Sequence, residues 1–332
     1  EAPVQNFHPL TNTATTTIVG GSFVGVKKGG IIQLTGGNGN TVDFSGAVSN
    51  STLQLGSGAN TFAAGSIGGT SGVTLDQSGS NEAQNVTVRG AASKFTYVGS
   101  SGADTLNMSG AVSNSTIDLG DGDNVFNAVN QTTAKNQSVS NTTLTASGTG
   151  SNTLTMGAFS FGTGGAVIGL GSGSNSITMN SVYGKGAAQL IIDASNSTAE
   201  QSLLIKGAVS NLTYTGSSGS DTVNIYGAVK NSTIGLGEGD NTFSAVNAAG
   251  KAQSVANTDI LAAGTGSNTY TMGTFTVGST GTTMNLSSGA NTINVGSIVS
   301  KGTLGMTIVA GSSTETQTLN ISGSATRLTY QG

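Results

Sequence analysis

Apolar and polar residues alternate with period two in short segments spread along the chain. Examples are TLNM at 105–108, TIDL at 116–119 and TVNI at 222–225. Alternation at 180° per residue is typical of a β-strand with one buried face, so Leu, Ile, Val and Met are expected inside and Thr, Asn and Ser outside. No segment carries an apolar stripe at helical spacing over about twelve residues, so we expect almost no helix.

Each alternating segment follows a turn of the form Gly-x-[Asn/Asp]-small-apolar-x-apolar. Gly and Asn supply the left-handed backbone conformations that tight turns need. Two weaker turns, at Asn81 and Asn196, divide the two longest gaps, and the turns then recur about every 20 to 28 residues. The polar residue of the turn is Asn40, Asn60, Asp104, Asn124, Asn152, Asn175, Asp221, Asn241, Asn268 and Asn291.

A second set of asparagines lies about ten residues before the first. Most of them are followed by a small residue, Thr and an apolar residue. Two turns and two strands per rung predict a flattened coil, and stacked Asn side chains can form hydrogen bonds from rung to rung. This second column consists of Asn50, Asn114, Asn141, Asn211, Asn231 and Asn257.

A longer repeat contains these rungs. The segment FTYVGSSGADTLNMSGAV that begins at Phe95 returns as LTYTGSSGSDTVNIYGAV at Leu212, a shift of 117 residues. Internal repeats of this kind predict a solenoid, in which each rung packs only on its neighbours. We therefore expect an all-β, parallel β-solenoid over residues 26–332, with long repeats at 99–215 and 216–332. Residues 1–25 lack the turn motif and are interpreted as an N-terminal extension or cap.

Composition narrows the classes of protein. Only 8% of the residues are charged, the net charge is −4, and there is no cysteine. The lack of a basic stripe argues against nucleic-acid binding, and no apolar run reaches the roughly 18 residues of a transmembrane helix. A chain without Cys has no disulfides or thiolate metal sites. The chain begins with Glu-Ala-Pro rather than Met, which predicts a secreted protein whose signal peptide has been removed.

The turns GGNGNTVDF at Gly36, GSSGADTLNM at Gly99 and GSSGSDTVNI at Gly216 resemble the glycine- and aspartate-rich repeats of secreted RTX proteins. More broadly, the chain is similar to bacterial secreted β-helix proteins such as adhesin stalks, autotransporter passengers, surface layers and matrix fibres. The resemblance implies an extracellular or cell-surface protein. In RTX repeats an Asp column binds Ca²⁺, whereas this column is mostly Asn, so most turns are expected to fold without metal.

Two acidic clusters occupy equivalent places in the long repeats. Stacked carboxylates and turn carbonyls can hold Ca²⁺, and the alternative is a set of solvated turn acids. Both interpretations stay open, and no other cofactor is expected. The candidate calcium ligands are Asp104, Asp121 and Asp123 in the first cluster and Asp221, Glu238 and Asp240 in the second.

Catalysis is not expected. The single histidine, His8, and the lack of Cys leave no Ser/His/Asp or Cys/His set within the repeats. A polysaccharide hydrolase or lyase is the enzyme alternative, but the acidic residues are duplicated, whereas active sites are usually single. Outward-facing pairs of Thr suggest two binding alternatives. One is a glycan or host surface, and the other is ice. Rungs of unequal length disfavour the flat face that ice binding needs.

The function expected from these patterns is a structural subunit of an extracellular filament, matrix fibre or surface layer. Free strand edges recruit partners, and LTYQG at 328–332 ends in mid-repeat without a polar cap. The uncharged, β-branched stretch around Thr16, Ile18 and Val19 suits an added strand. We therefore expect residues 1–25 of one subunit to pair with the rung of Leu328 and Tyr330 in the next, giving a head-to-tail homopolymer.

Overall fold

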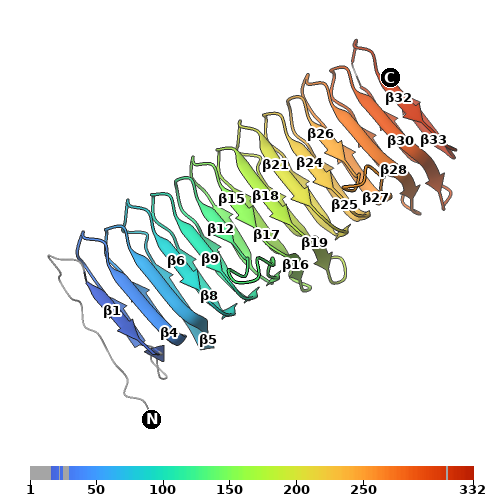
Figure 1. The fold of residues 1–332 in the computed structure, drawn as a ribbon. Helices are drawn as coiled ribbons and strands as arrows, with labels where there is room; N and C mark the ends of the chain where they lie inside the picture. The colour runs from blue at the N-terminus through green and yellow to red at the C-terminus, as the bar shows by residue number, and fades with distance from the viewer. Residues whose placement is uncertain (1–15, 22, 25–29, 312) are drawn as a thin grey trace. The chain divides into compact units, whose positions relative to one another are not determined.

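The computed structural model describes residues 16–21, 23–24, 30–311 and 313–332. It confirms an all-β, parallel β-solenoid, with about 13 turns of about 23 residues each and no helix among the described residues (Figure 1). The described residues pack as two compact units. One extends to Ser160 and includes Val167–Gly171, and the other comprises Phe161–Ala166 and Ser172–Gly332. In this part of the chain there is also no helix long and apolar enough to cross a membrane.

The strands are short, and most contain two to five residues. The strands up to residue 170 are β1 (Thr17–Gly20), β2 (Phe23–Val24), β3 (Gly30–Gln33), β4 (Thr41–Gln54), β5 (Thr61–Asp76), β6 (Asn85–Val88), β7 (Ala92–Ser93), β8 (Phe95–Val98), β9 (Thr105–Met108), β10 (Val112–Ser113), β11 (Thr116–Asp118), β12 (Val125–Asn127), β13 (Val139–Ser140), β14 (Thr143–Ala146), β15 (Thr153–Thr155), β16 (Ala158–Phe161) and β17 (Ala166–Leu170). The remaining strands are β18 (Asn175–Met179), β19 (Ser181–Gly184), β20 (Leu190–Asp193), β21 (Gln201–Ile205), β22 (Val209–Ser210), β23 (Leu212–Thr215), β24 (Thr222–Ile225), β25 (Val229–Gly235), β26 (Thr242–Ser244), β27 (Val255–Leu261), β28 (Thr269–Val277), β29 (Thr282–Asn285), β30 (Thr292–Ser300), β31 (Met306–Val309), β32 (Thr318–Ile321) and β33 (Leu328–Gln331).

A typical rung contains three strands, whereas the sequence predicted two. In one rung of the first unit, β9 follows the turn at Asp104, β10 has only two residues, and β11 begins just after Asn114. Asn114, with a φ of 50°, lies between β10 and β11 and bends the chain there. The equivalent Asn231 also has a φ of 50° but lies within the continuous strand β25, so the bend does not by itself divide a strand. Each strand then pairs in parallel with its counterparts in the rungs before and after, as β9 does with β6 and β12.

The period-two pattern fixes which side chains enter the core. Leu106 and Met108 of β9 and Ile117 of β11 are fully buried. Leu106 stacks in register between Val86 and Phe126 of the neighbouring rungs. Full burial of one such side chain contributes about 1.5–3 kcal/mol, and the stack repeats this contribution in every rung. The strand faces expected from the sequence are therefore confirmed in these rungs.

Glycine is required where turns of successive rungs lie against each other. Gly120 and Gly122 have φ values of 71° and 83°, in the left-handed region that side chains rarely adopt. A Cβ atom at Gly120 would also lie 2.1 Å from the carbonyl oxygen of Ser100 in the preceding rung. Both constraints explain the Gly-x-Gly spacing around the turn that ends at Asn124.

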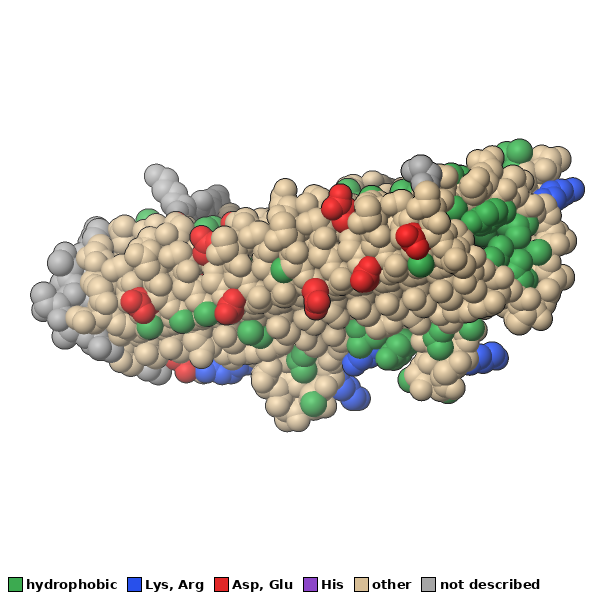
Figure 2. All heavy atoms as spheres, turned by 90° about the horizontal axis from the view of Figure 1, so that it is seen from above, with side chains coloured by type: hydrophobic (Ala, Val, Ile, Leu, Met, Phe, Trp, Pro, Cys, Tyr) green, Lys and Arg blue, Asp and Glu red, His purple; other side chains and the backbone are tan. Residues whose placement is uncertain are grey.

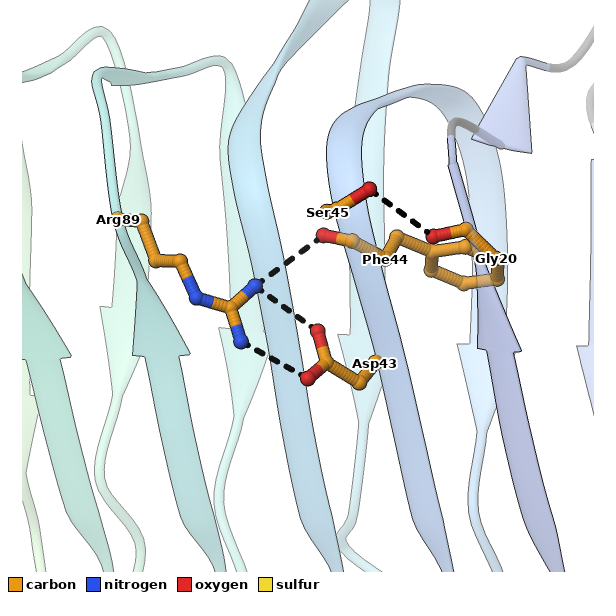
Figure 3. A network of polar contacts seen from close by, with 5 residues as sticks. All are labelled: Gly20, Asp43, Phe44, Ser45 and Arg89. Carbon is orange, nitrogen blue, oxygen red and sulfur yellow. Dashed lines mark hydrogen bonds and ion pairs between the residues drawn. The ribbon is translucent and has the colours of Figure 1, made fainter.

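An ion pair connects rungs at the start of the first unit (Figure 3). Arg89, just after β6, donates to the two carboxylate oxygens of Asp43 in β4, each at 2.8 Å, and to the Phe44 carbonyl at 3.3 Å. Ala63 of β5 lies in register beside Asp43, and its small side chain leaves room for this bridge. The hydrogen bonds from Arg89 hold the pKa of Asp43 below its ordinary value. A pair this exposed contributes about 0–1 kcal/mol.

Candidate functional site

A column of polar side chains, all buried except the half-buried Gln317, follows the turns of each unit. A side-chain oxygen of Asn, Asp or Gln accepts a hydrogen bond from the backbone N–H of the equivalent residue one rung earlier. The Asn40 N–H donates to Asn60 Oδ1 at 2.9 Å, and the Asp104 N–H donates to Asn124 Oδ1 at 2.7 Å. These bonds confirm the expected rung-to-rung contacts of stacked Asn side chains. We call this set the interior ladder; it consists of Asn40, Asn60, Gln84, Asp104, Asn124 and Asn152 in the first unit and Asn175, Gln201, Asp221, Asn241, Asn268, Asn291 and Gln317 in the second.

The amide nitrogen of an Asn in the interior ladder closes its own turn. Asn124 Nδ2 donates to the carbonyl oxygens of Asp121 at 2.8 Å and Gly122 at 3.0 Å. Asn241 makes the same contacts with Glu238 and Gly239. A buried amide is costly unless its donors and acceptor are used, and these are. Each such Asn therefore stabilises its turn and binds the preceding rung.

The sequence prediction placed the weaker turns at Asn81 and Asn196, but the structure places both of these side chains outside. The buried residues of these turns are Gln84 and Gln201. Gln84 Nε2 donates to Ser80 Oγ at 3.0 Å and to the Glu82 carbonyl at 2.6 Å, and Gln201 uses Ser197 in the same way. The signal that identifies these residues is the Ser-x-x-x-Gln spacing, which recurs with the long repeat.

Asp104 and Asp221 form a second kind of turn. Asp104 accepts four hydrogen bonds, from the Tyr97 hydroxyl at 2.7 Å, the Ser100 N–H at 2.8 Å, the Ser100 hydroxyl at 2.6 Å and the Gln84 N–H at 2.9 Å. An ionised carboxylate has only acceptors, so all four donors fit it. Its residue type is therefore explained by hydrogen bonding within the core.

The second Asp turn repeats this arrangement. Asp221 accepts from the Tyr214 hydroxyl at 3.3 Å, the Ser217 N–H and hydroxyl at 2.7 Å each, and the Gln201 N–H at 2.9 Å. Burial raises the pKa of Asp221, and the bonds from Ser217 and Gln201 oppose this shift. Burial and the neighbouring carboxylate also raise the pKa of Tyr214, which keeps its hydroxyl protonated as a donor. The Tyr–Asp contact joins residues seven positions apart in the sequence and was not anticipated.

The other four calcium candidates lie at the surface. Asp121 Oδ1 accepts from the Thr149 N–H at 3.1 Å, and Asp123 Oδ1 accepts from the Ser151 N–H at 2.7 Å, both one rung further on. Asp240 makes the contact equivalent to that of Asp123, with the Ser267 N–H at 2.7 Å. Glu238 is exposed. The carboxylates of Asp121, Asp123 and Asp240 therefore cap exposed N–H groups of the next turn.

The structure separates the six candidates into two kinds. Asp104 and Asp221 lie inside the core, whereas Asp121, Asp123, Glu238 and Asp240 are exposed. Figure 2 shows acidic side chains spaced singly over one face. Among the described residues no group of three or more Asp, Glu or His side chains is placed to hold a metal ion. Calcium binding stays a prediction, and calorimetric titration with Ca²⁺ tests it.

The second Asn column has the conformation that the sequence predicted. All six of its asparagines have positive φ, from 46° to 60°. Their side chains are stacked in places, since Asn141 Nδ2 donates to Asn114 Oδ1 at 3.3 Å and Asn257 Nδ2 donates to Asn231 Oδ1 at 3.1 Å. Lys94 takes the same conformation in a rung without Asn, with a φ of 53°.

The candidate assembly residues lie in β1, directly before it at Thr16, and in β33. The Thr16 N–H donates to Asn40 Oδ1 at 3.0 Å, and β1, which contains Ile18, pairs with β4 of its own chain. One edge of the expected donor strand is therefore already used. The side chain of Val19 and residues 1–15 lie outside the described part of the chain. Leu328 and Tyr330 belong to β33, which pairs with β31, and Tyr330 is 44% exposed.

A groove of about 560 Å³ lies in the second unit, along β28, β30 and β32. Thr271, Asn294 and Asn320 supply hydroxyl and amide groups, and Asn320 Nδ2 donates to Asn294 Oδ1 at 2.9 Å. Leu319 and Ile321 supply apolar lining. Hydrophobic side chains are gathered on the face at this end of the second unit (Figure 2). The groove therefore combines hydrogen-bonding groups with apolar surface.

Comparison with known proteins identifies no relative. No protein-family model, no curated protein and no solved structure matches this chain.

Proposed function

We propose that this protein is a structural subunit of an extracellular filament, matrix fibre or surface layer, in which copies join through the edges of their solenoids. The observation that supports the proposal is the way rungs stack, since each described rung gives its neighbour a parallel backbone ladder and inward apolar side chains. At β32 and β33 the inward-facing Leu319, Ile321 and Leu328 are only partly covered, so the edge of these strands would accept a further rung. An added rung buries this apolar surface and pairs the backbone, as in other strand-added structures.

The donors of this edge are identified by the strand pairing. The Gln331 carbonyl accepts from the Ala310 N–H at 2.7 Å, so the backbone groups of Gln331 point back to the preceding rung. Because these groups alternate along a strand, the N–H groups of Leu328 and Tyr330 point to the outer edge. At the other end the Thr16 N–H points to Asn40, so the N–H of Thr17 points away from β4.

Proline substitution at these positions tests the proposal. Tyr330→Pro and Thr17→Pro each remove one outward N–H, and we expect both variants to remain monomeric in sedimentation under conditions where the parent forms long assemblies in electron micrographs. Tyr330→Ala is the matched control, because it keeps the N–H and should still assemble. A parent that stays monomeric at high concentration, or proline variants that assemble like the parent, would reject edge-to-edge joining.

The groove in the second unit favours a second function, binding of a glycan as an adhesin stalk or passenger. Hydroxyls and amides in register hydrogen-bond to sugar hydroxyls, and the apolar lining covers the sugar ring. A glycan array tests this: Asn294→Ala should abolish binding. Asn224→Ala is the matched control, because it removes an Asn from the same face of β24, outside the groove lining. Loss of binding in both variants would place the site elsewhere.

A further inference from the structure

Charged side chains of the second unit lie on separate sides of its rungs (Figure 2). Each rung has a turn segment, which ends at a residue of the interior ladder, and a bend segment, which joins the strand after that residue to the strand that leads to the next turn. The bend segments contain no Asp or Glu, and they contain every Lys and Arg of this unit. The segments are residues 180–189, 206–211, 226–232, 246–258, 273–281, 296–305 and 322–327, and the exposed cations in them are Lys185, Lys206, Lys230, Lys251, Lys301 and Arg327.

The exposed acids of the turn segments lie at the other end of the rungs. They are Glu200, Glu238, Asp240 and Glu315, and the remaining acids of the unit are the buried Asp221 and, in β20 and β27, Asp193 and Asp259. A strand of about four residues separates turn from bend, so the two ends are roughly 13 Å apart. This exceeds the Debye length of about 8 Å at physiological ionic strength. Among the described residues of this unit no ion pair is formed, so its opposite charges do not neutralise each other.

Each rung with an exposed acid in its turn also has a cation in its bend. Strand pairing sets the heights: β21 pairs with β24 and β24 with β26, so the rungs of Gln201 and Asn241 are two steps, or about 10 Å, apart. The charges on the two sides therefore follow the same spacing. The matched sets are Glu200 with Lys206, Glu238 and Asp240 with Lys251, and Glu315 with Arg327, in the rungs of Gln201, Asn241 and Gln317.

We infer that the second unit is a lateral contact surface for a second copy of this chain, in which the bend side of one copy packs against the turn side of its neighbour at equal height. Sideways translation alone brings Lys206 to Glu200 of the neighbour and Lys251 to Glu238 of the neighbour. Because the two sides are different surfaces, the contact does not close on a pair and continues into a layer. It goes beyond the proposed joining of solenoid edges and does not depend on it.

Two other cations of the bend side have no exposed acid at their own height. Lys230 belongs to the rung of Asp221, which is buried, and Lys301 belongs to the rung of Asn291, whose turn LSSGAN has no acidic residue. Attraction by total charge would involve these lysines as much as Lys206 and Lys251, whereas contact at matched heights depends mainly on the latter. The two pairs of lysines therefore distinguish a specific contact from a general one.

Sedimentation of the full chain in about 10 mM salt tests the contact, because the Debye length is then about 30 Å. The parent should associate, and the double variant Lys206→Gln, Lys251→Gln should associate about tenfold more weakly, since exposed ion pairs are weak singly and act together here. The matched control Lys230→Gln, Lys301→Gln removes the same charge from the same side and should weaken association by at most about threefold. All four lysines are exposed, so circular dichroism should be unchanged.

Charge exchange gives a second readout. One variant carries Lys206→Glu and Lys251→Glu, and the other carries Glu200→Lys, Glu238→Lys and Asp240→Asn. Each variant alone presents like charges on both sides at the matched heights and should stay dispersed in the same buffer. An equimolar mixture should associate about as strongly as the parent, because the acidic bends of one variant then face the basic turns of the other.

Each other outcome overturns the inference. A parent that does not associate in low salt removes the contact. Equal weakening by the two double lysine variants would show attraction by total charge, as in the binding of any polyanion. A dispersed mixture of the exchanged variants would show that the lysines do not meet the turn acids. All variants keep the edges of the solenoid, so failure of end-to-end joining appears separately, as a lack of long assemblies while lateral association is retained.

Discussion

The substitution Tyr→Phe at three buried tyrosines is expected to lower the free energy of unfolding at two sites and to raise it at the third. Tyr97 and Tyr214 donate to buried carboxylates, at 2.7 and 3.3 Å. Tyr270 is also fully buried, but its hydroxyl has no hydrogen-bond partner among the described residues. The corresponding residue of the first long repeat is Leu154, which has no polar group. The change Tyr→Phe removes only the hydroxyl. Its effect on the free energy of unfolding therefore shows whether that hydroxyl has a hydrogen-bond acceptor in the folded protein.

The expected magnitudes follow from hydrogen bonding and burial. A buried polar group without a partner costs about 1–3 kcal/mol, so Tyr270→Phe should raise the free energy of unfolding by that amount. Tyr97→Phe loses a bond to a charged acceptor and should lower it by about 1.5–3 kcal/mol. The longer bond of Tyr214 predicts a smaller loss, about 0.5–1.5 kcal/mol.

Urea unfolding followed by far-ultraviolet circular dichroism measures all three variants. A change in midpoint at constant slope reports stability alone. We expect the order Tyr270→Phe, parent, Tyr214→Phe, Tyr97→Phe, from most to least stable. If all three substitutions destabilise, the effect comes from the packing of the ring rather than from the hydroxyl partner, and our account of these three sites would be wrong.

Other substitutions test the interior ladder and the bends. Asp104→Asn should lower the free energy of unfolding by about 1–3 kcal/mol, because an amide then faces the donors of the Asp turn; a neutral result in urea would contradict this. The reciprocal Asn124→Asp should also destabilise, since a carboxylate then faces turn carbonyls, and thermal melting checks it. Asn114→Gly should leave stability nearly unchanged, whereas Asn114→Val should cost about 1–2 kcal/mol at its positive φ. Equal melting temperatures of the two variants would contradict this account of the bend. The pKa of Asp221 is raised by burial, so its contribution to stability is fully present below the unfolded pKa and is lost as pH rises through the folded pKa. The free energy of unfolding, measured across this acidic range, should show that loss in the parent but not in Asp221→Asn. An increase of the parent's stability with rising pH would contradict the account of Asp221.

The alternation of residue types, together with the recurring turns and the internal repeats, was sufficient to predict the fold. It identified the inward side chains, for example Leu106 and Ile117, because period two has only one buried register per strand. The positive φ of the second Asn column was also predictable, because few residues other than Gly and Asn adopt that conformation readily. The number of strands per rung was not predictable. A single left-handed residue such as Asn114 bends the chain without a reversal, and the local sequence does not distinguish the two outcomes.

The candidate site was predicted only in part. The column of Asn and Asp was identified, but Asp104 was grouped with Asp121 and Asp123 as a calcium candidate, whereas in the structure it lies in the core. Its partners explain why this burial was not predictable: Tyr97 and Ser100 come from the same turn and Gln84 from the rung before, and this convergence depends on how the turn is oriented. Residue type alone cannot give that orientation.

The interior ladder also determines where rungs can be gained or lost during evolution. A rung anchored by Asn accepts another Asn rung on either side, so a duplication or deletion between Asn turns joins compatible surfaces. A Gln turn is different, because its N–H and the following Tyr hydroxyl require the carboxylate of the next rung. The Gln and Asp rungs should therefore be inherited together. A recombination break between them would leave the Gln N–H and the Tyr hydroxyl buried without their carboxylate acceptor.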